Sequence, residues 1–149
     1  MKLVRENIFE FQRGADPSEI LELGRLQKTI DWLKPYLFRS SYSINQDWTI
    51  DIKKDFIVTN SMPNLEEFPE FIQFNICYGS FINRSHQFIS MIGCPKIVYG
   101  DFLVDGNKLQ VLTGCPKQVN GDFYIQDNDT KFTENEVRKI CQIKGKLKV

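Results

Sequence analysis

The chain has 149 residues, with 19 basic and 19 acidic side chains, so its formal net charge is zero. This length predicts one domain, and 42% apolar and 13% aromatic residues exclude a disordered chain. The balanced charge argues against a dedicated nucleic-acid binder, and no apolar run approaches the roughly 18 residues of a membrane-spanning helix.

The N-terminal sequence predicts a protein without a secretion signal. Charged side chains interrupt residues 1–7 before the apolar stretch of a signal peptide can form, so we expect a cytoplasmic location. Cysteines stay reduced in that compartment. Because no two of them form a Cys-x-x-Cys pair, we predict no metal site and no cofactor. The four cysteines are Cys77, Cys94, Cys115 and Cys141.

Two helical segments are predicted before residue 40. Apolar side chains within residues 4–12 predict a short amphipathic helix that Gly14 ends. A second helical segment begins after Asp16, because Asp-Pro-Ser-Glu supplies an aspartate cap and a proline in the first turn. Its apolar stripe ends at Pro35, and we expect Gly24 to divide it into two helices.

Strands are predicted next in the chain. Apolar and polar residues alternate at 42–45 and 48–52, as is typical of strands that are buried on one face. Lys53 and Lys54 are expected to form a hairpin turn into a third strand at 56–58.

An internal repeat organises the second half of the chain, and its period of about 21 residues is typical of solenoid repeats. Residues 93–102, Gly-Cys-Pro-Lys-Ile-Val-Tyr-Gly-Asp-Phe, recur at 114–123 as Gly-Cys-Pro-Lys-Gln-Val-Asn-Gly-Asp-Phe. A third copy is recognisable at 79–81 and a looser one at 54–56. Units of this length bury their apolar faces by stacking, so about four copies predict a solenoid of the leucine-rich-repeat kind. Each repeat phenylalanine is then expected to lie over that of its neighbour.

The end of the chain predicts a cap for this solenoid. The pattern Thr-x-x-Glu at 133–136 is a capping box and predicts a short helix. Lys144 and Gly145 then turn the chain into a last strand at 147–149. Solenoids require atypical end units of this sort to close their core.

These elements predict a single α+β domain, in which N-terminal helices precede a short leucine-rich-repeat-like β-solenoid with a C-terminal helix–strand cap. We place the N-terminal helical arm at 1–40, the solenoid at 41–130 and the C-terminal cap at 131–149. The repeat units are expected near 54–78, 79–99, 100–120 and 121–130.

The repeat resembles units found in leucine-rich-repeat-like proteins of bacteriophages, which have the form Leu-x-x-Leu-x-Gly-Cys/Ala-Pro-Lys-x-Val-x-Gly-x-Phe. Residues 1–14 and 132–138 also resemble the opening and the ending of such proteins. The chain departs from the regular pattern before residue 79, where an insertion follows Pro69. The resemblance implies a solenoid encoded by a phage, but the family has no known activity to assign to any residue.

Alternation along the repeat strands sorts their side chains into an inward and an outward face. The repeat phenylalanines and valines lie on the inward face. The outward face carries a column of Ile57, Ile82, Leu103 and Tyr124, with Tyr78 and Tyr99 beside it. An exposed apolar column is typical of a surface that binds another protein. The alternative is that a terminal helix packs over the column and buries it.

Few residues favour catalysis. His86 is the only histidine, so Ser–His or Cys–His catalysis would depend on it, but its place in the asparagine slot of the repeat favours a polar turn residue. Asp101 and Asp122 lie on neighbouring units and form a candidate acid–base pair, although exposed strand carboxylates usually only solubilise. Cys94 and Cys115 occupy equal repeat positions and are expected to stack as buried thiols.

The segment 131–149 carries six basic and two acidic side chains. We interpret its lysines as solvated groups that also protect an edge strand from pairing. Contact with an acidic partner or with phosphates is the alternative.

We therefore predict a non-enzymatic protein-interaction module that is phage-encoded and acts on a host protein in the bacterial cytoplasm, for example by inhibiting a defence system. The first alternative is a virion or assembly accessory protein. The second is a small-molecule-binding protein or an enzyme. The predicted partner is a protein of the host or the phage, with no membrane involved, and a homodimer is left open.

Overall fold

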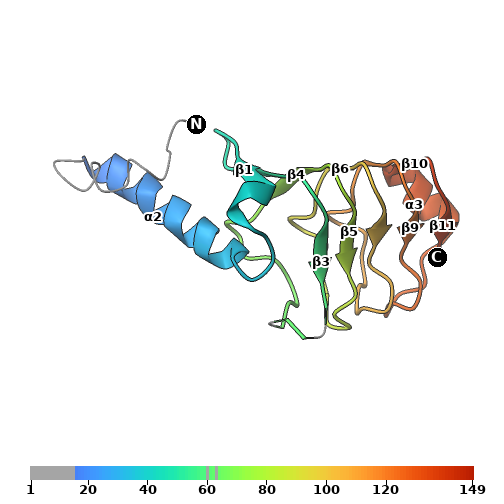
Figure 1. The fold of residues 1–149 in the computed structure, drawn as a ribbon. Helices are drawn as coiled ribbons and strands as arrows, with labels where there is room; N and C mark the ends of the chain where they lie inside the picture. Colours follow the sequence, from blue (N-terminus) through green and yellow to red (C-terminus); the bar gives the residue numbers. More distant parts are fainter. Residues whose placement is uncertain (1–15, 60, 63) are drawn as a thin grey trace.

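The computed structural model describes residues 16–149 except for 60 and 63. Figure 1 shows one long helix, then a β-solenoid whose turns lie side by side, and a short helix at the far end. The structure is a parallel β-solenoid of about 4 turns. The helix predicted within residues 4–12 lies outside the described residues.

The long helix α2 (Pro17–Leu33) begins at the predicted cap. The Asp16 carboxylate accepts from the Glu19 N–H at 3.0 Å, and the Glu19 carboxylate accepts from the Asp16 N–H at 3.1 Å. The predicted division at Gly24 is wrong, because one continuous helix of 17 residues runs through it. A glycine inside a helix costs about 1 kcal/mol relative to alanine but leaves the backbone hydrogen bonds intact.

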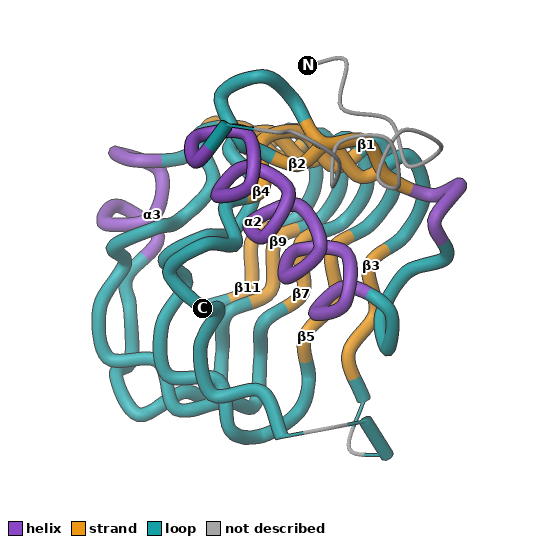
Figure 2. Tube along the Cα trace, turned by 90° about the vertical axis from the view of Figure 1, so that its left-hand side faces the viewer, coloured by secondary structure: helices purple, strands orange, loops and turns teal. Residues whose placement is uncertain are grey.

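Helix α2 and the turn after it close the N-terminal end of the core. Figure 2 shows α2 running across the stacked turns at that end. Leu33 is fully buried, and the ring of Tyr36 lies 5.5 Å from that of Phe56, centroid to centroid. A short 3-10 helix (Arg39–Ser41) then leads into the sheets.

The predicted strands before the repeats are observed as β1 (Tyr42–Ile44) and β2 (Ile50–Ile52), which pair in antiparallel fashion. The predicted hairpin at Lys53 and Lys54 is wrong. β2 and the next strand, β3 (Phe56–Val58), lie in different sheets, and each pairs in parallel with a strand of the following turn. The two lysines therefore occupy a corner of the solenoid rather than the tip of a hairpin.

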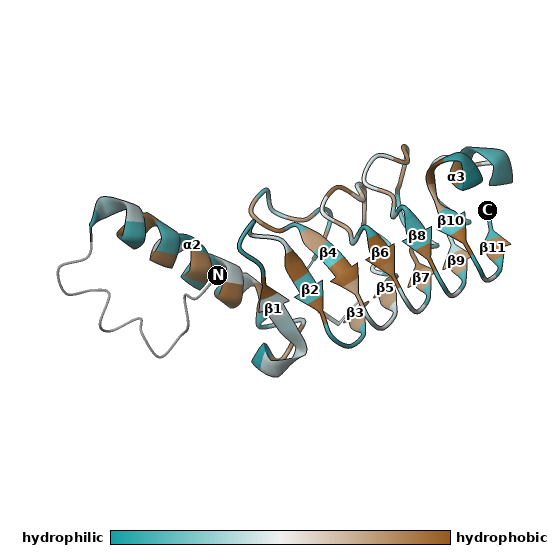
Figure 3. Cartoon of the chain, turned by 90° about the horizontal axis from the view of Figure 1, so that it is seen from above, coloured by the Kyte–Doolittle hydropathy of each residue, from teal (hydrophilic) through white to brown (hydrophobic). Residues whose placement is uncertain are grey.

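Every turn contributes one strand to each of two sheets, which Figure 3 shows side by side. The first sheet has the order β1-β2-β4-β6-β8-β10 and the second the order β11-β9-β7-β5-β3. The predicted single strand of each repeat unit is thus two short strands joined by a corner. In the first sheet they are β4 (Phe74–Cys77), β6 (Ile97–Val98), β8 (Gln118–Val119) and β10 (Gln142–Ile143). In the second sheet they are β5 (Phe81–Asn83), β7 (Phe102–Leu103), β9 (Phe123–Tyr124) and β11 (Leu147–Lys148).

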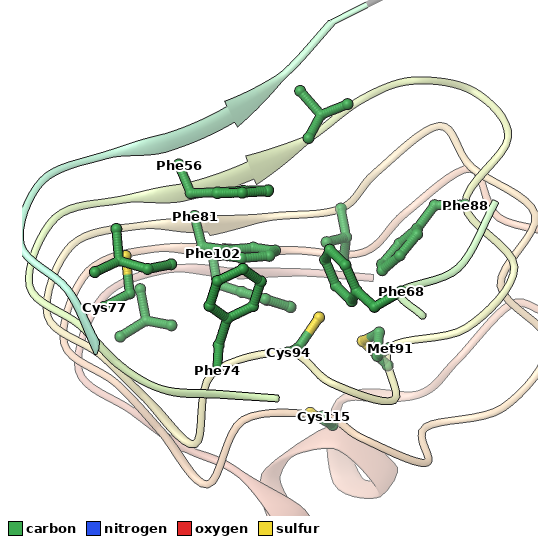
Figure 4. Packing of buried hydrophobic residues seen from close by; sticks show 14 of the residues in the cluster. Phe56, Phe68, Phe74, Cys77, Phe81, Phe88, Met91, Cys94, Phe102 and Cys115 are labelled. Atoms are coloured by element: carbon green, nitrogen blue, oxygen red, sulfur yellow. The ribbon is translucent and has the colours of Figure 1, made fainter. Parts of the chain in front are cut away.

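A column of phenylalanines forms the centre of the core, as the repeat predicts. Phe56, Phe81, Phe102 and Phe123 are register partners in successive turns, and all four are fully buried. Neighbouring ring centroids lie 4.8, 5.6 and 5.0 Å apart, and Figure 4 shows the first three rings stacked. Burying one such side chain stabilises the fold by about 1.5–3 kcal/mol.

The repeated Gly-Asp pair is explained by the corner between the sheets. The Gly121 N–H donates to the Gly100 carbonyl oxygen at 2.9 Å, and a Cβ on Gly121 would lie 2.6 Å from that oxygen. The space over Gly121 holds the Asp101 carboxylate, which accepts from the Asp122 N–H at 2.8 Å. The pattern continues as the Asp122 carboxylate accepts from the Lys146 N–H at 2.8 Å. Glycine is needed because each side-chain oxygen reaches across it to the next turn.

Buried asparagines join the turns on the loop side. The Asn107 side-chain amide donates to the Asn83 carbonyl oxygen at 2.6 Å and accepts from the Phe88 N–H at 3.2 Å. Asn128 repeats these contacts one turn later. The predicted place of His86 in this slot is wrong. His86 is exposed with φ of 67°, and it matches the left-handed residues next to the two asparagines, Gly106 and Asp127.

The C-terminal helix α3 (Glu134–Ile140) has the predicted capping box. The Thr133 hydroxyl accepts from the Glu136 N–H at 3.2 Å, and the Glu136 carboxylate accepts from the Thr133 N–H at 2.9 Å. The predicted last strand is β11. Strand β10, which directly follows the helix, was not predicted, and it extends the first sheet by one more strand.

Candidate protein-binding face

The second sheet carries the predicted outward column. Ile57 pairs with Ile82, Ile82 with Leu103, and Leu103 with Tyr124, so the four residues form one line across β3, β5, β7 and β9. Ile57 is 40% exposed, and the other three side chains are half-buried. We call these four residues the outer column.

Tyr78 and Tyr99 lie at the corner between the two sheets, directly after β4 and β6. Their rings stack in parallel, with 5.4 Å between centroids and 2° between planes. They are 53% and 45% exposed, which is high for large aromatic side chains. We call them the tyrosine pair, and together with the outer column they make up the candidate face.

A polar line separates the tyrosine pair from the outer column. Ser80, Asp101 and Asp122 occupy it, and their side-chain oxygens accept backbone N–H groups of the following turns at 2.8–3.0 Å. These hydrogen bonds explain the two aspartates as links between turns. The acid–base pair suggested by the sequence has no further support from the contacts of these carboxylates.

Neither described helix covers the candidate face. Figures 1 and 3 show α2 at the N-terminal end of the solenoid and α3 at the C-terminal end, and Figure 3 shows α3 on the side of the first sheet rather than over β3, β5, β7 and β9. The exposure of Ile57, Tyr78 and Tyr99 agrees with this arrangement. Within the described residues, the alternative of a helix packed over the column is therefore not observed.

Charged groups border the outer column. The Lys148 ammonium lies 4.6 Å from the centroid of the Tyr124 ring, in a cation–π contact at the C-terminal end of the column. Arg84 and Asp105 form an ion pair of 2.9 Å after β5 and β7. An apolar centre with a polar rim is the usual anatomy of a protein interface.

Lys148 belongs to this site but was not predicted from the sequence. It is the register partner of Tyr124 in β11. The sequence pattern that could have placed Lys148 beside Tyr124 is weak, because Leu147 follows Phe123 at a longer spacing than the period of the repeat. A helix inserted between the two turns hides the alignment.

The cysteines are buried and free. Burial raises the pKa of the Cys94 thiol well above its usual range and raises the pKa of Cys77 to about 12. A hydrogen bond with Cys141, and then burial, raises the pKa of Cys115. Neutral buried thiols are poor nucleophiles and poor metal ligands. This description applies to Cys77, Cys94 and Cys115, because the same hydrogen bond from the other side lowers the pKa of Cys141.

The described contacts of His86 are those of a turn residue at the surface. Its ring is exposed, and its Nδ1 lies 2.9 Å from the carbonyl oxygen of Gly106 in the next turn. In the described part of the chain, no three potential metal ligands of the His, Cys, Asp or Glu type come together.

Comparisons with protein-family models, curated proteins and solved structures found no match to this chain. The class of protein is accordingly defined by the fold alone, as a parallel β-solenoid that follows an N-terminal helix and ends with a short helix and strands. No described helix combines the length and hydrophobicity needed to cross a membrane.

Proposed function

We propose that this protein is a non-enzymatic interaction module that binds another protein through the candidate face. One observation carries the proposal: apolar side chains form a line across four strands, beside two stacked and half-exposed tyrosines. Solvation does not require such an arrangement, whereas exposed apolar patches mark interaction sites and tyrosine is enriched among the residues that dominate binding energy.

The rigidity of the face supports this role. Each residue of the outer column belongs to a strand that is hydrogen-bonded to its neighbours, and the tyrosine rings restrain one another by stacking. A surface held in place before binding loses little conformational entropy when a partner docks. A preorganised sheet face therefore suits recognition of a folded protein surface.

The resemblance of the Gly-Cys-Pro-Lys repeat to leucine-rich-repeat-like phage proteins supports a more specific proposal. In it, the module is phage-encoded and acts on a bacterial host protein, for example a defence enzyme that it inhibits. Docking to phage structural proteins as a virion or assembly accessory is the alternative function for the same face. A small-molecule-binding protein or an enzyme is the third candidate function.

The test is an affinity capture from bacterial lysate and from infected cells, with quantitative mass spectrometry of the bound proteins. The wild type is compared with Leu103→Arg, which places a charge in the middle of the outer column. We expect capture of one stoichiometric protein to fall about tenfold or more. The bound protein distinguishes a host target from a phage structural protein.

The matched control is Gln118→Arg, which adds the same charge on β8 of the first sheet, outside the candidate face. It should capture the partner as well as the wild type does. Equal capture by Leu103→Arg and the wild type would show that the face is not the binding site, and circular dichroism would show whether either variant is unfolded.

A further inference from the structure

A groove lies between α3 and the loop of the preceding turn. It has a volume of about 440 Å³. Its apolar lining includes Val111 and Ile140, which are 55% and 46% exposed, and the more buried Leu112 and Phe132. Two large aliphatic side chains thus face solvent across one depression, on a different part of the molecule from the candidate face.

Apolar exposure continues along this edge of the solenoid. The loop one turn earlier exposes Ile89 and Ile92, which are 41% and 59% accessible to solvent. They lie one repeat period before Gln110 and Thr113, in the same part of the repeat. Exposed aliphatic side chains therefore occur in the loops of two successive turns, Ile89 and Ile92 in one and Val111 in the next.

The charge around the groove is positive. Lys131 and Lys139 line it, and neither forms an ion pair with a described residue. The one acidic group in the lining, Glu136, already accepts the Thr133 N–H in the capping box. Along α3, the charges of Glu134 and Arg138 lie 3.9 Å apart and offset each other. Among the described residues, the lining thus carries two lysines and one glutamate, a net charge of +1 beside an apolar groove.

We propose that this groove binds an acidic peptide segment of a protein partner, with one apolar side chain of the peptide inserted between Val111 and Ile140. Carboxylates on either side of that anchor would meet Lys131 and Lys139. The half-exposed lining favours a peptide over a free fatty acid, because small-molecule sites usually enclose most of their ligand. This site goes beyond the proposed function and does not depend on the candidate face.

The experiment is selection of a random peptide display library on the purified full chain. We expect enriched peptides to carry one large apolar residue flanked by Asp or Glu. Binding of a synthetic enriched peptide, measured by fluorescence anisotropy, should weaken about tenfold with Ile140→Ser. It should also weaken as salt rises, because exposed charge pairs are screened.

A charge reversal tests the chemistry of the partner. The double variant Lys131→Glu/Lys139→Glu should select basic instead of acidic peptides. The matched control Lys144→Glu/Lys146→Glu changes the same number of charges outside the groove lining and should select acidic peptides as the wild type does. Leu103→Arg should bind the enriched peptide normally, which separates this site from the candidate face.

Three outcomes would overturn the proposal. The first is a selection that enriches no acidic and apolar consensus. The second is an equal loss of peptide binding in both lysine double variants. The third is displacement of the enriched peptide by a short DNA duplex at low micromolar concentration, since that result would assign the lysines to phosphate binding.

Discussion

The turn that contains β4 and β5 differs from the two turns after it at positions that the repeat makes equivalent. Cys77 is the register partner of Val98 in the core. Asn83 is fully buried at the position where the next turn has Val104, and its side-chain amide nitrogen has no hydrogen-bond partner among the described residues. The later turns stack similar side chains, whereas the earlier turn places polar groups in the same core.

This difference shows how a solenoid tolerates an irregular turn. Each turn contacts only its neighbours, so its stability is approximately a sum of local contributions. A polar substitution in one turn lowers stability there without disturbing the register of the others. The phenylalanine column and the crowded glycine at the corner are shared by the regular and the irregular turns, and they are expected to dominate the stability of the stack.

Gly121→Ala is expected to have the largest effect, because it breaks the feature that the turns share. The added Cβ would lie 2.6 Å from the Gly100 carbonyl oxygen, and a backbone atom cannot move aside as a flexible side chain can. We expect a loss of about 3 kcal/mol in the free energy of unfolding, measured by urea denaturation. The control is Gly24→Ala, where nothing lies within 4 Å of the new Cβ. It should stabilise the protein by about 1 kcal/mol.

Cys77→Val is expected to make the free energy of unfolding less dependent on pH in the alkaline range. Burial raises the pKa of Cys77 to about 12, whereas an unfolded thiol has a pKa of about 8.5. Below that value the thiol is protonated in both states. As the pH rises further, only the unfolded chain releases the proton, so stability falls by up to about 1.4 kcal/mol per pH unit.

The measurement is urea unfolding of the wild type and Cys77→Val at several pH values between about 7 and 10.5. The difference in slope isolates Cys77, because all other titrating groups are common to both proteins. Identical slopes would show that this thiol is ionised as easily in the folded protein as in the unfolded chain.

Asn83→Val makes the irregular turn resemble the later ones. The change removes a buried amide nitrogen without a described partner, at the cost of the Ser85 N–H bond to Asn83 Oδ1. We expect a gain of about 1 kcal/mol, seen as a higher midpoint of thermal unfolding. A loss of similar size would mean that the amide makes a contact that the later turns do not need.

The tyrosine pair gives the smallest expected effect. Aromatic pairs contribute about 0.5–1.5 kcal/mol beyond their buried area, and exposure places this pair at the low end. A double-mutant cycle with Tyr78→Ala and Tyr99→Ala should give a coupling energy of about 0.5 kcal/mol. Coupling indistinguishable from zero would indicate that the stack does not order the face.

Much of the solenoid was predictable from the sequence, because stacking repeats the same contact at each turn. The period of the repeat predicts the phenylalanine column, and the two capping motifs at Asp16 and Thr133 predict where helices begin. The corner was not predictable from alternation alone. Residues 97–103 alternate as one continuous strand would. The structure shows a corner at Gly100, where a Cβ would lie 2.8 Å from the Gly79 carbonyl oxygen of the preceding turn.

The other features that the sequence did not predict correctly depend on contacts between residues that are far apart in the chain. His86 was assigned to the asparagine slot because its spacing from Phe81 equals that of Asn107 from Phe102, but its backbone has the left-handed conformation of Gly106. The groove beside α3 joins segments around Val111 and Ile140 that are separated in the sequence. No local pattern could place those two side chains across one depression.

Hydrogen bonds link each turn to the turn before it. The Asp101 carboxylate accepts the Asp122 N–H of the following turn, and the Asn107 amide reaches back to Asn83 and Phe88. Each new turn therefore completes its contacts with residues that the ribosome has already made. Assembly during synthesis can proceed turn by turn from the N-terminal end, and each turn docks onto one that is already in place.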